Sequence, residues 1–144
     1  MANNSDEKIE REQLEADVVI VGAGPAGLAC ALRLAELIAN HNRESGSSSL
    51  SAENIYVIEK ADELGMHSLS GAVMDPRGLR ELVPDCEKQG APLDTPVTDD
   101  AAYFLTAKRA LRFPITPPPL RNHGNYVVSL ARLVQWLGQR AEQA

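Results

Sequence analysis

Residues 17–27, DVVIVGAGPAG, constrain the fold more than any other stretch of this chain. The apolar residues 18–21 are β-branched, which predicts a buried parallel strand. The strand runs directly into three glycines, and a helical pattern follows. Gly22 permits a tight turn, Gly24 lets the backbone approach a pyrophosphate, and Gly27 lets the helix pack close to the strand. This order of strand, glycine turn and helix predicts the start of a dinucleotide-binding unit.

The residues after the turn have the spacing of an amphipathic helix, predicted from about 25 to 40. Such a helix points its unpaired N–H groups and the positive end of its dipole at bound phosphates. Cys30 is expected to be a small apolar filler on the buried side. The expected core face consists of Leu28, Ala31, Leu32, Ala35 and Ala39, widened by Leu34, Leu37 and Ile38.

A second buried strand is predicted at residues 55–58, and Glu59 and Lys60 follow it. An acidic residue at this strand end can accept hydrogen bonds from both ribose hydroxyls of an adenosine, and it disfavours a 2′-phosphate. Gly27 and Glu59 are 32 positions apart, whereas about 20 is usual. The polar, Ser-rich stretch 41–54 is predicted to be a surface loop that accounts for the excess, since lengthening such a loop costs little.

The rest of the chain contains shorter elements. Small and polar residues at 65–73 can lie across a cofactor without crowding it. Asp75 and Pro76 are expected to start a short helix that Pro84 terminates. The remaining predictions are a loop at 90–100, a hairpin of 102–106 with 110–113, an extended polyproline-like connection at 115–121, a loop and short strand over 122–128, and a final helix capped by Ser129.

Composition excludes several classes of protein. The chain has 144 residues, a net charge of -6 and a pI near 5.0, which argues against a nucleic-acid partner. Its two cysteines form neither a disulfide framework nor a metal site. No signal peptide, transit peptide or membrane-spanning segment is recognisable. We expect a charged, flexible N-terminus at 1–14 and, at 15–144, the N-terminal part of an FAD-binding domain.

The predicted fold class is α/β, a Rossmann-like FAD/NAD(P)-binding fold that is incomplete and consists of a βαβ unit plus a hairpin and helices. Spacing alone leaves FAD and NAD open, because both use the same turn and acidic residue. Several further blocks, in this order, resemble the N-terminal part of the electron-transfer flavoprotein–ubiquinone oxidoreductase family. These blocks are Val57-Ile-Glu-Lys60, His67-Ser-Leu-Ser-Gly-Ala72, Asp75-Pro-Arg77, Gly90-Ala-Pro-Leu93, Thr95-Pro-Val-Thr98, Asn122-His-Gly-Asn-Tyr126 and Leu133-Val-Gln-Trp-Leu137.

The resemblance implies an oxidoreductase that passes electrons from reduced electron-transfer flavoprotein to ubiquinone through one FAD and one four-iron–four-sulfur cluster. The cluster ligands of the family lie far C-terminal to this region, so no metal ligand is expected here. No catalytic side chain is assigned, because the cofactors carry the chemistry. The FAD-binding residues that the resemblance implies are Gly22, Ala23, Gly24, Pro25, Ala26, Gly27, Glu59, Lys60, Leu69, Ser70, Gly71 and Arg132.

The resemblance also implies peripheral membrane contact through about 68–89, at the cytoplasmic face of a bacterial inner membrane or, in a eukaryote, at the mitochondrial inner membrane. The short helix expected there could equally be core packing. Cys86 stands where we expect an aromatic residue in relatives, and its presence would weaken an interfacial anchor.

Two alternatives stay open at the level of sequence. One is another FAD-dependent oxidoreductase of the geranylgeranyl-reductase or aromatic-hydroxylase type, whose first strand and glycines look similar. Such proteins usually carry an arginine where this chain has Leu130, and they lack the block GAPLDTPVT. The other alternative is a non-catalytic truncated remnant. In either reading, we expect these 144 residues alone to be inactive, because they supply only the front half of an FAD site.

Overall fold

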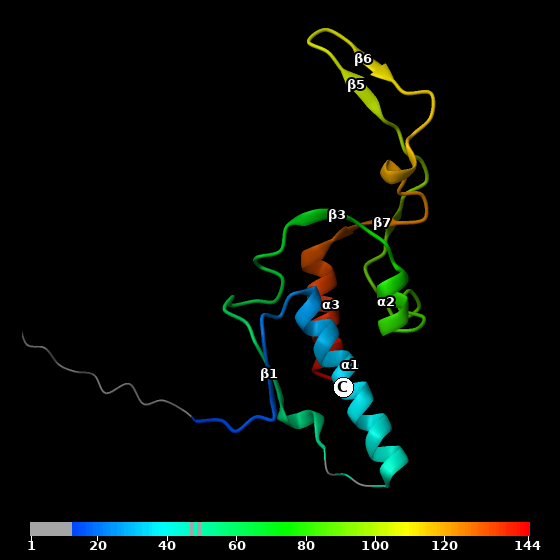
Figure 1. Cartoon of the computed structure of the whole chain (residues 1–144). Helices are drawn as coiled ribbons and strands as arrows, with labels where there is room; N and C mark the ends of the chain where they lie inside the picture. The colour runs from blue at the N-terminus through cyan, green and yellow to red at the C-terminus, as the bar shows by residue number, and fades with distance from the viewer. Residues whose placement is uncertain (1–12, 47, 49) are drawn as a thin grey trace, which may run out of the picture.

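The computed structural model describes residues 13–46, 48 and 50–144, so most of the segment expected to be flexible lies outside the described residues. Its first unit is a strand β1, Val18–Val21, a helix α1, Pro25–Ser45, and a strand β2, Ile55–Ile58 (Figure 1). The two strands are parallel, with Val18 opposite Ile55. The predicted βαβ unit is thereby confirmed.

Helix α1 is longer than the sequence predicted. Proline occupies its first turn, and the helix continues to Ser45, where Gly46 adopts a left-handed conformation with φ of 63°. This conformation is the usual end of a helix, because glycine adopts it without steric cost. The expected loop 41–54 is therefore partly helical, and a short 3₁₀ helix η1, Ala52–Asn54, leads into β2.

One face of the β1–β2 sheet is uncovered, so the prediction of fully buried strands was wrong. Val19 and Val21 are 51% and 84% exposed, and Ile58 is 53% exposed. The alternate residues, such as Val18 and Ile20, are half-buried. Continuous β-branched residues indicate a strand suited to burial on both faces, and here only one face is packed.

A second, antiparallel sheet has the order β3–β7–β4. Its strands are β3, Ser70–Met74, β7, Tyr126–Ser129, and β4, Thr95–Pro96. The sequence predicted β7 but placed β4 inside a loop and left 65–73 without regular structure. Two-residue strands such as β4 exist only through their partner, so local pattern does not reveal them.

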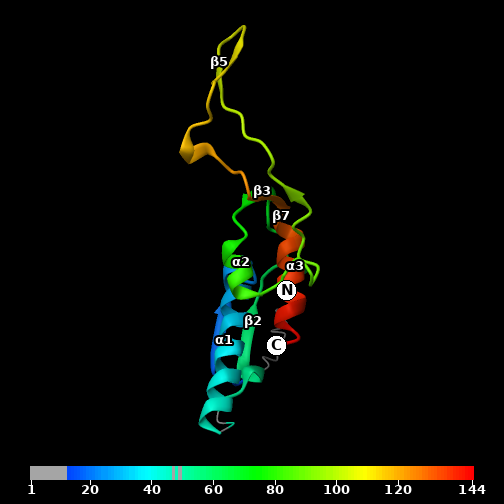
Figure 2. The same ribbon diagram turned by 90° about the vertical axis from the view of Figure 1, so that its right-hand side faces the viewer.

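The helices α2, Arg77–Leu82, and α3, Leu130–Ala141, complete the core. The Ser129 hydroxyl accepts a hydrogen bond from the Arg132 N–H at 3.4 Å, which confirms the predicted cap of α3. Helix α3 packs against α1, as both views show (Figures 1 and 2). The buried core residues are Ala23, Leu28, Leu79, Cys86, Ala91, Leu93, Val128, Leu133, Val134 and Leu137.

The predicted hairpin is confirmed as β5, Tyr103–Leu105, and β6, Ala110–Arg112. It forms the end of an arm that projects from the rest of the chain (Figures 1 and 2). The Asp100 carboxylate ties the base of the arm together, accepting hydrogen bonds from the N–H groups of Asn122 and His123 at 2.9 and 3.1 Å. The returning connection is not wholly extended as predicted, because Pro118–Leu120 form a 3₁₀ helix, η2.

The two cysteines occupy different environments, and that of Cys30 is opposite to the one expected. Cys30 is exposed on α1, so it is no core filler. Cys86 is fully buried, and burial is the main cause that raises the pKa of its thiol. Ala39 and Leu37, predicted on the core face of α1, are exposed, because the C-terminal half of this helix extends beyond the core. No helix among the described residues is long and apolar enough to cross a bilayer.

Candidate functional site

The glycine turn connects β1 to α1 and is hydrogen-bonded to the end of β2. Gly22 has a φ of 102°, a conformation that L side chains rarely adopt, and its N–H donates a hydrogen bond of 2.7 Å to the Ile58 carbonyl oxygen. A Cβ added to Gly27 would lie 2.0 Å from the Gly22 carbonyl oxygen. Gly22 therefore makes the tight turn and Gly27 the close helix–strand contact, as their spacing predicted.

Gly24 faces open space. It is the N-cap of α1 and has an extended backbone, and nothing lies within 4 Å of the position of an added Cβ. No side chain caps this helix start, and its first turn has no acidic residue. The positive end of the helix dipole is thus directed at a space that a side chain on Gly24 would fill. An anionic pyrophosphate fits such a cradle.

The Glu59 carboxylate lies directly beside this cradle. Its Oε2 accepts a hydrogen bond from the Ala23 N–H at 2.9 Å. Its Oε1 accepts from the N–H groups of Lys60 and Ala61 at 2.9 and 3.1 Å. Glu59 therefore connects the end of β2 to the glycine turn.

These hydrogen bonds lower the pKa of Glu59 below its ordinary value of 4.5. The bond from the Ala23 N–H is the largest cause, that from the Ala61 N–H is the next, and the electrostatic interaction with His67 contributes further. The carboxylate is therefore ionised at neutral pH, with oxygen lone pairs still available to hydroxyl donors. An ionised acceptor at the end of β2 is the chemistry that a ribose diol requires.

The other residues that were predicted to contact FAD lie outside the glycine turn or pair with other residues of the chain. Lys60 is exposed and follows Glu59 at the strand end. Ser70 pairs with Ser129 at the N-terminal end of α3, and the register shifts between Ser70 and Ala72. Gly71 sits in this bulge with a φ of 82°, while Leu69 is 84% exposed. The structure thus places residues 69–71 beside α3, and their contact with a flavin stays a prediction.

Arg132 forms an ion pair with Asp94, with 2.6 Å between a guanidinium nitrogen and Oδ2. Both side chains are more than half exposed, and such surface pairs are worth about 0–1 kcal/mol. The pair joins the first turn of α3 to the segment before β4. A role for Arg132 in binding FAD stays a prediction.

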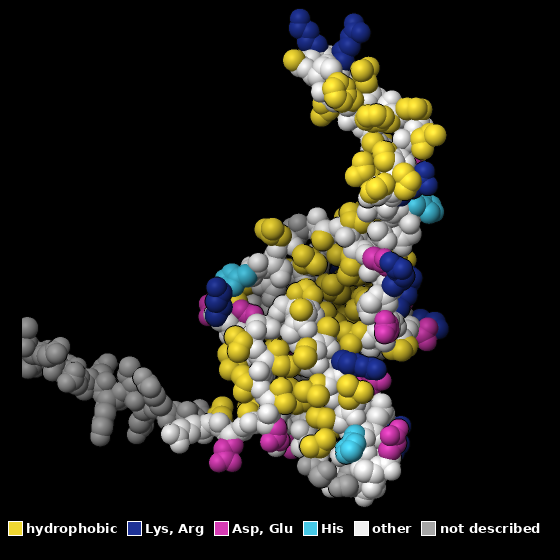
Figure 3. Space-filling model, in the orientation of Figure 1, with side chains coloured by type: hydrophobic (Ala, Val, Ile, Leu, Met, Phe, Trp, Pro, Cys, Tyr) yellow, Lys and Arg dark blue, Asp and Glu magenta, His cyan; other side chains and the backbone are white. Residues whose placement is uncertain are grey.

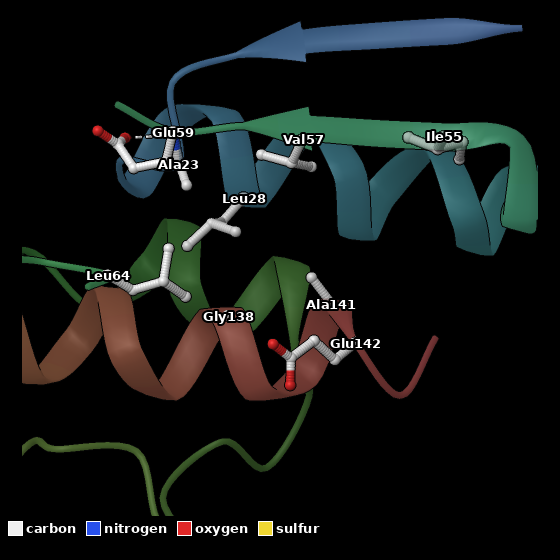
Figure 4. A pocket seen from close by; sticks show the side chains of 9 residues that line it. All are labelled: Ala23, Leu28, Ile55, Val57, Glu59, Leu64, Gly138, Ala141 and Glu142. Atoms are coloured by element: carbon white, nitrogen blue, oxygen red, sulfur yellow. Dashed lines mark hydrogen bonds between the residues drawn. The ribbon is translucent and has the colours of Figure 1, made fainter. Parts of the chain in front are cut away.

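A pocket of about 290 Å³ opens beside Glu59, between β2, α1 and α3. In Figure 4, Leu28 and Leu64 point into it from opposite sides, and α3 lies below them. Leu64 also packs against Gly138, where an added Cβ would lie 2.2 Å from its Cδ1. Sequence reasoning did not identify Leu64 or Gly138, because their contact joins a loop to a helix far along the chain.

The described residues contain no group of three or more His, Cys, Asp or Glu side chains that could hold a metal ion. The whole chain has two cysteines, and a four-iron–four-sulfur cluster is normally held by four. The residues present therefore fit a nucleotide but do not fit an iron–sulfur cluster.

Residues 20–87 match the family model described as "NAD(P)-binding Rossmann-like domain", which agrees with the observed parallel strands and glycine turn. Curated proteins match almost the whole chain. It is 50% identical over 135 residues to "Electron transfer flavoprotein-ubiquinone oxidoreductase, mitochondrial" of Bos taurus, covering 93% of this chain and 21% of that relative. The protein of the same name from Dictyostelium discoideum is 50% identical over 132 residues, covering 92% and 20%.

A bacterial relative is similar to the same extent. "Probable electron transfer flavoprotein-ubiquinone oxidoreductase" of Acinetobacter baylyi is 46% identical over 138 residues, covering 94% of this chain and 23% of that protein. The chain thus spans about a fifth of the length of the curated relatives that it matches. The resemblance inferred from the sequence is confirmed: over this fifth, the chain is related to the electron transfer flavoprotein-ubiquinone oxidoreductases.

Proposed function

We propose that the turn 22–27 and the Glu59 carboxylate form the wall of an FAD site that binds the pyrophosphate and the adenosine ribose. The hydrogen bond from the Ala23 N–H to Glu59 Oε2 carries this proposal. It holds the phosphate-binding turn and the ribose-binding carboxylate at one point, as a dinucleotide requires. The relatives are named electron transfer flavoprotein-ubiquinone oxidoreductases, and the resemblance to that family favours FAD over NAD.

Each part of this wall has its own task. The N–H groups at the start of α1 and the helix dipole hold the phosphates, and Glu59 accepts hydrogen bonds from the ribose hydroxyls. The further contacts proposed from the resemblance are Lys60, Leu69, Ser70, Gly71 and Arg132. When bound, FAD supplies the capacity to accept and release electrons, so this chain contributes binding and orientation rather than an acid or base.

The proposed reaction of the whole protein is electron transfer from reduced electron-transfer flavoprotein to ubiquinone, as the relatives' name states. We place the iron–sulfur cluster in the part of such proteins outside the matched residues, because two cysteines cannot supply its ligands. A polypeptide of these 144 residues alone is proposed to be inactive in this transfer. It supplies one wall of the flavin site and no cluster.

Titration of FAD into the isotopically labelled 144-residue chain tests the nucleotide site. We expect a weak dissociation constant, on the order of 0.1 mM or higher, and amide shifts centred on residues 22–27 and 59–60. Gly24→Ala is expected to weaken binding about tenfold while the protein stays folded, because its methyl group occupies the pyrophosphate space. Gly78→Ala is the matched control, since nothing lies within 4 Å of its Cβ position either.

Two outcomes would contradict the proposal. Amide shifts that avoid the turn at millimolar FAD would remove the proposed site. A purified chain that already carries stoichiometric yellow flavin would instead contradict the expectation that 144 residues bind FAD only weakly.

We also propose peripheral membrane contact, and the exposed apolar side chains of the arm support a position there rather than on α2. Within 68–89, Leu79 and Cys86 are buried, and Leu82 and Val83 pack against the core. Their packing against the core supports the alternative of core packing for α2. The Cys86 position is consequently no interfacial anchor.

The arm offers the apolar surface instead. Phe104, Leu105 and Ile115 are 58%, 72% and 70% exposed. Figure 3 shows apolar side chains along the arm and Lys or Arg side chains at its tip; Lys108 and Arg109 lie in the turn between β5 and β6. Exposed aromatic and aliphatic residues beside basic ones suit a lipid interface. We therefore place the proposed membrane contact on the arm.

Vesicle flotation can distinguish the two positions. For the chain with Phe104→Ser and Leu105→Ser, binding to vesicles of phosphatidylcholine and phosphatidylglycerol is expected to fall about tenfold or more, since two apolar groups lose their burial in lipid. Leu69→Ser, at a still more exposed apolar position inside 68–89, should leave binding unchanged. An equal loss for Leu69→Ser, or no binding by the unmodified chain, would refute the placement.

A further inference from the structure

The arm is attached to the rest of the chain without core packing. All residues from 98 to 124 are described, and none of them is buried. Among the strands that the structure describes, β5 and β6 pair with each other alone, and an isolated two-stranded hairpin is at best marginally stable in water. The direction of the arm therefore depends on the hydrogen bonds at its base.

Asp100 is the centre of these hydrogen bonds. Its Oδ2 accepts from the N–H groups of Asn122 and His123 at 2.9 and 3.1 Å, and its Oδ1 accepts from the Asn122 side chain at 3.4 Å. Its main-chain carbonyl oxygen accepts from the Thr116 hydroxyl at 3.0 Å. One residue of the outgoing segment thus binds both ends of the returning segment 116–123.

The returning segment is stiff. It contains three consecutive prolines, 117–119, whose rings fix their φ angles, and Pro118–Leu120 form the 3₁₀ helix η2. The Arg121 guanidinium donates a hydrogen bond of 3.0 Å to the Thr116 carbonyl oxygen across this helix. A stiff segment that is bound to Asp100 at both ends closes a triangle, which resists bending more than a single contact does. Figure 1 shows η2 in orange between the hairpin and β7.

The base of the arm continues into the core through β7. The Val97 N–H donates to the Asn125 carbonyl oxygen at 2.8 Å, and the Gly124 N–H donates to the Val97 carbonyl oxygen at 3.4 Å. Strand β7 begins at the next residue, Tyr126, and pairs with β3 and β4. It ends at Ser129, which caps α3, and α3 packs against α1, the helix that follows the glycine turn. A stiff base therefore connects the arm to the elements that carry the proposed nucleotide site.

We propose that Asp100 is a positioning residue, which together with the segment 116–123 forms a rigid joint that fixes the direction of the arm. The joint thereby sets how far the turn 22–27 and Glu59 stand from a lipid surface. This consequence rests on the proposed membrane contact of the arm, whereas the rigidity of the joint does not. The separation matters for the proposed reaction, because ubiquinone is soluble in lipid and the rate of electron transfer falls steeply with distance.

The test measures the distance between two spin labels in the 144-residue chain. One label is attached to Cys30, which is exposed on α1, and the other to the cysteine that Lys108→Cys introduces at the tip of the arm. Cys86 is fully buried and stays unlabelled in the folded chain. We expect a narrow distribution of distances for this labelled chain. Asp100→Ala should broaden the distribution at least about twofold, because it removes charge-assisted hydrogen bonds, which are the strong ones.

Asp99→Ala is the matched control. The Asp99 carboxylate accepts a hydrogen bond from the Asp100 N–H and lies 3.9 Å from Arg112, and neither contact reaches the segment 116–123. The control removes the same charge and should leave the distribution narrow. Asp100→Asn keeps one acceptor oxygen for the two N–H groups that bind the carboxylate, so it should restore most of the order. The midpoint of urea unfolding should be similar in all these variants, since none of them changes a buried residue.

Thr116→Val is the second variant, for the case in which Asp100→Ala does not fold. It keeps the shape of the side chain, removes the hydroxyl that donates to Asp100, and should broaden the distribution to a smaller extent. Its control is Thr98→Val, at an exposed position of the outgoing segment.

Several results would overturn the joint. They are a broad distribution in the labelled chain itself, a narrow one in a folded Asp100→Ala, or, if that variant does not fold, a narrow one in Thr116→Val. Equal broadening by Asp99→Ala or by Asp100→Asn would assign the effect to charge alone and overturn it too.

Vesicle flotation of the chains without labels separates the joint from the membrane contact. Asp100→Ala should bind vesicles several-fold more weakly than the unmodified chain, because a loose arm has to be ordered on binding. If the unmodified chain binds no vesicles while Asp100→Ala broadens the distribution, the membrane contact is refuted and the joint stands. A broad distribution in Asp100→Ala with unchanged vesicle binding would overturn the positioning role at a lipid surface.

Discussion

Gly27→Ala is expected to lower the free energy of unfolding by about 3 kcal/mol, in a protein class whose total is about 5–15 kcal/mol. The added Cβ would lie 2.0 Å from the Gly22 carbonyl oxygen and 3.4 Å from Cγ2 of Ile20. The oxygen belongs to a backbone that also bonds to β2, so it cannot rotate away. The helix must instead move off the strand.

Helix propensity makes the opposite prediction, which sharpens the test. Alanine is favoured over glycine inside a helix by about 1 kcal/mol, so a stabilised variant would mean that the contact at Gly27 relaxes. The control Gly78→Ala lies in α2, with nothing within 4 Å of its Cβ, and should be neutral or slightly stabilising. Urea unfolding followed by circular dichroism measures both. Equal midpoints for Gly27→Ala and the unmodified chain would contradict the prediction.

Glu59→Gln is expected to weaken nucleotide binding roughly tenfold to a hundredfold. The charged carboxylate would lose hydrogen bonds from the backbone N–H groups of the protein and from the ribose hydroxyls. An amide nitrogen would replace one carboxylate oxygen. It would then face either the Ala23 N–H or the N–H groups of Lys60 and Ala61, all of which donate to Glu59. The ribose would also lose an ionised acceptor.

The control for this variant is Glu63→Gln, which removes the same charge from an exposed position in the same loop. Titration with adenosine diphosphate, observed through the amides of the glycine turn, measures the change. If Glu59→Gln and Glu63→Gln bind the nucleotide with the same affinity, any loss of affinity is due to the change in net charge and not to the Glu59 contacts. A shift of the Ala23 amide resonance in Glu59→Gln alone would locate the cause.

Glu59 also predicts a pH dependence of stability. Its pKa in the folded protein is below the ordinary 4.5, so its contribution is complete above pH 4.5 and is lost as the pH falls through the folded pKa. Asp75 beside Arg77, and Glu87 through its own N–H and Arg80, have lowered pKa values too. The difference between the unmodified chain and Glu59→Gln isolates Glu59: it should shrink below pH 4.5. A difference independent of pH there would contradict the assignment.

Features that depend on neighbours in the chain were predictable from the sequence. The β-branched run at 18–21, the glycine spacing of the turn and the Ser129 cap each act within a few residues. A local pattern therefore carries their physical cause. The same holds for β2 and for the hairpin, whose two strands and turn lie in one short stretch. The family resemblance then made FAD the expected ligand, which no local pattern could do.

Features that depend on distant contacts were decided by the tertiary structure alone. The bond between Ala23 and Glu59 spans 36 positions. The full burial of Cys86 and the exposure of Cys30 depend on which surfaces pack together in the folded chain, which composition does not encode. Strand β4 exists only because β7 lies beside it. The glycine turn thus follows from sequence, whereas its attachment to Glu59 arises from packing between segments that the sequence keeps apart.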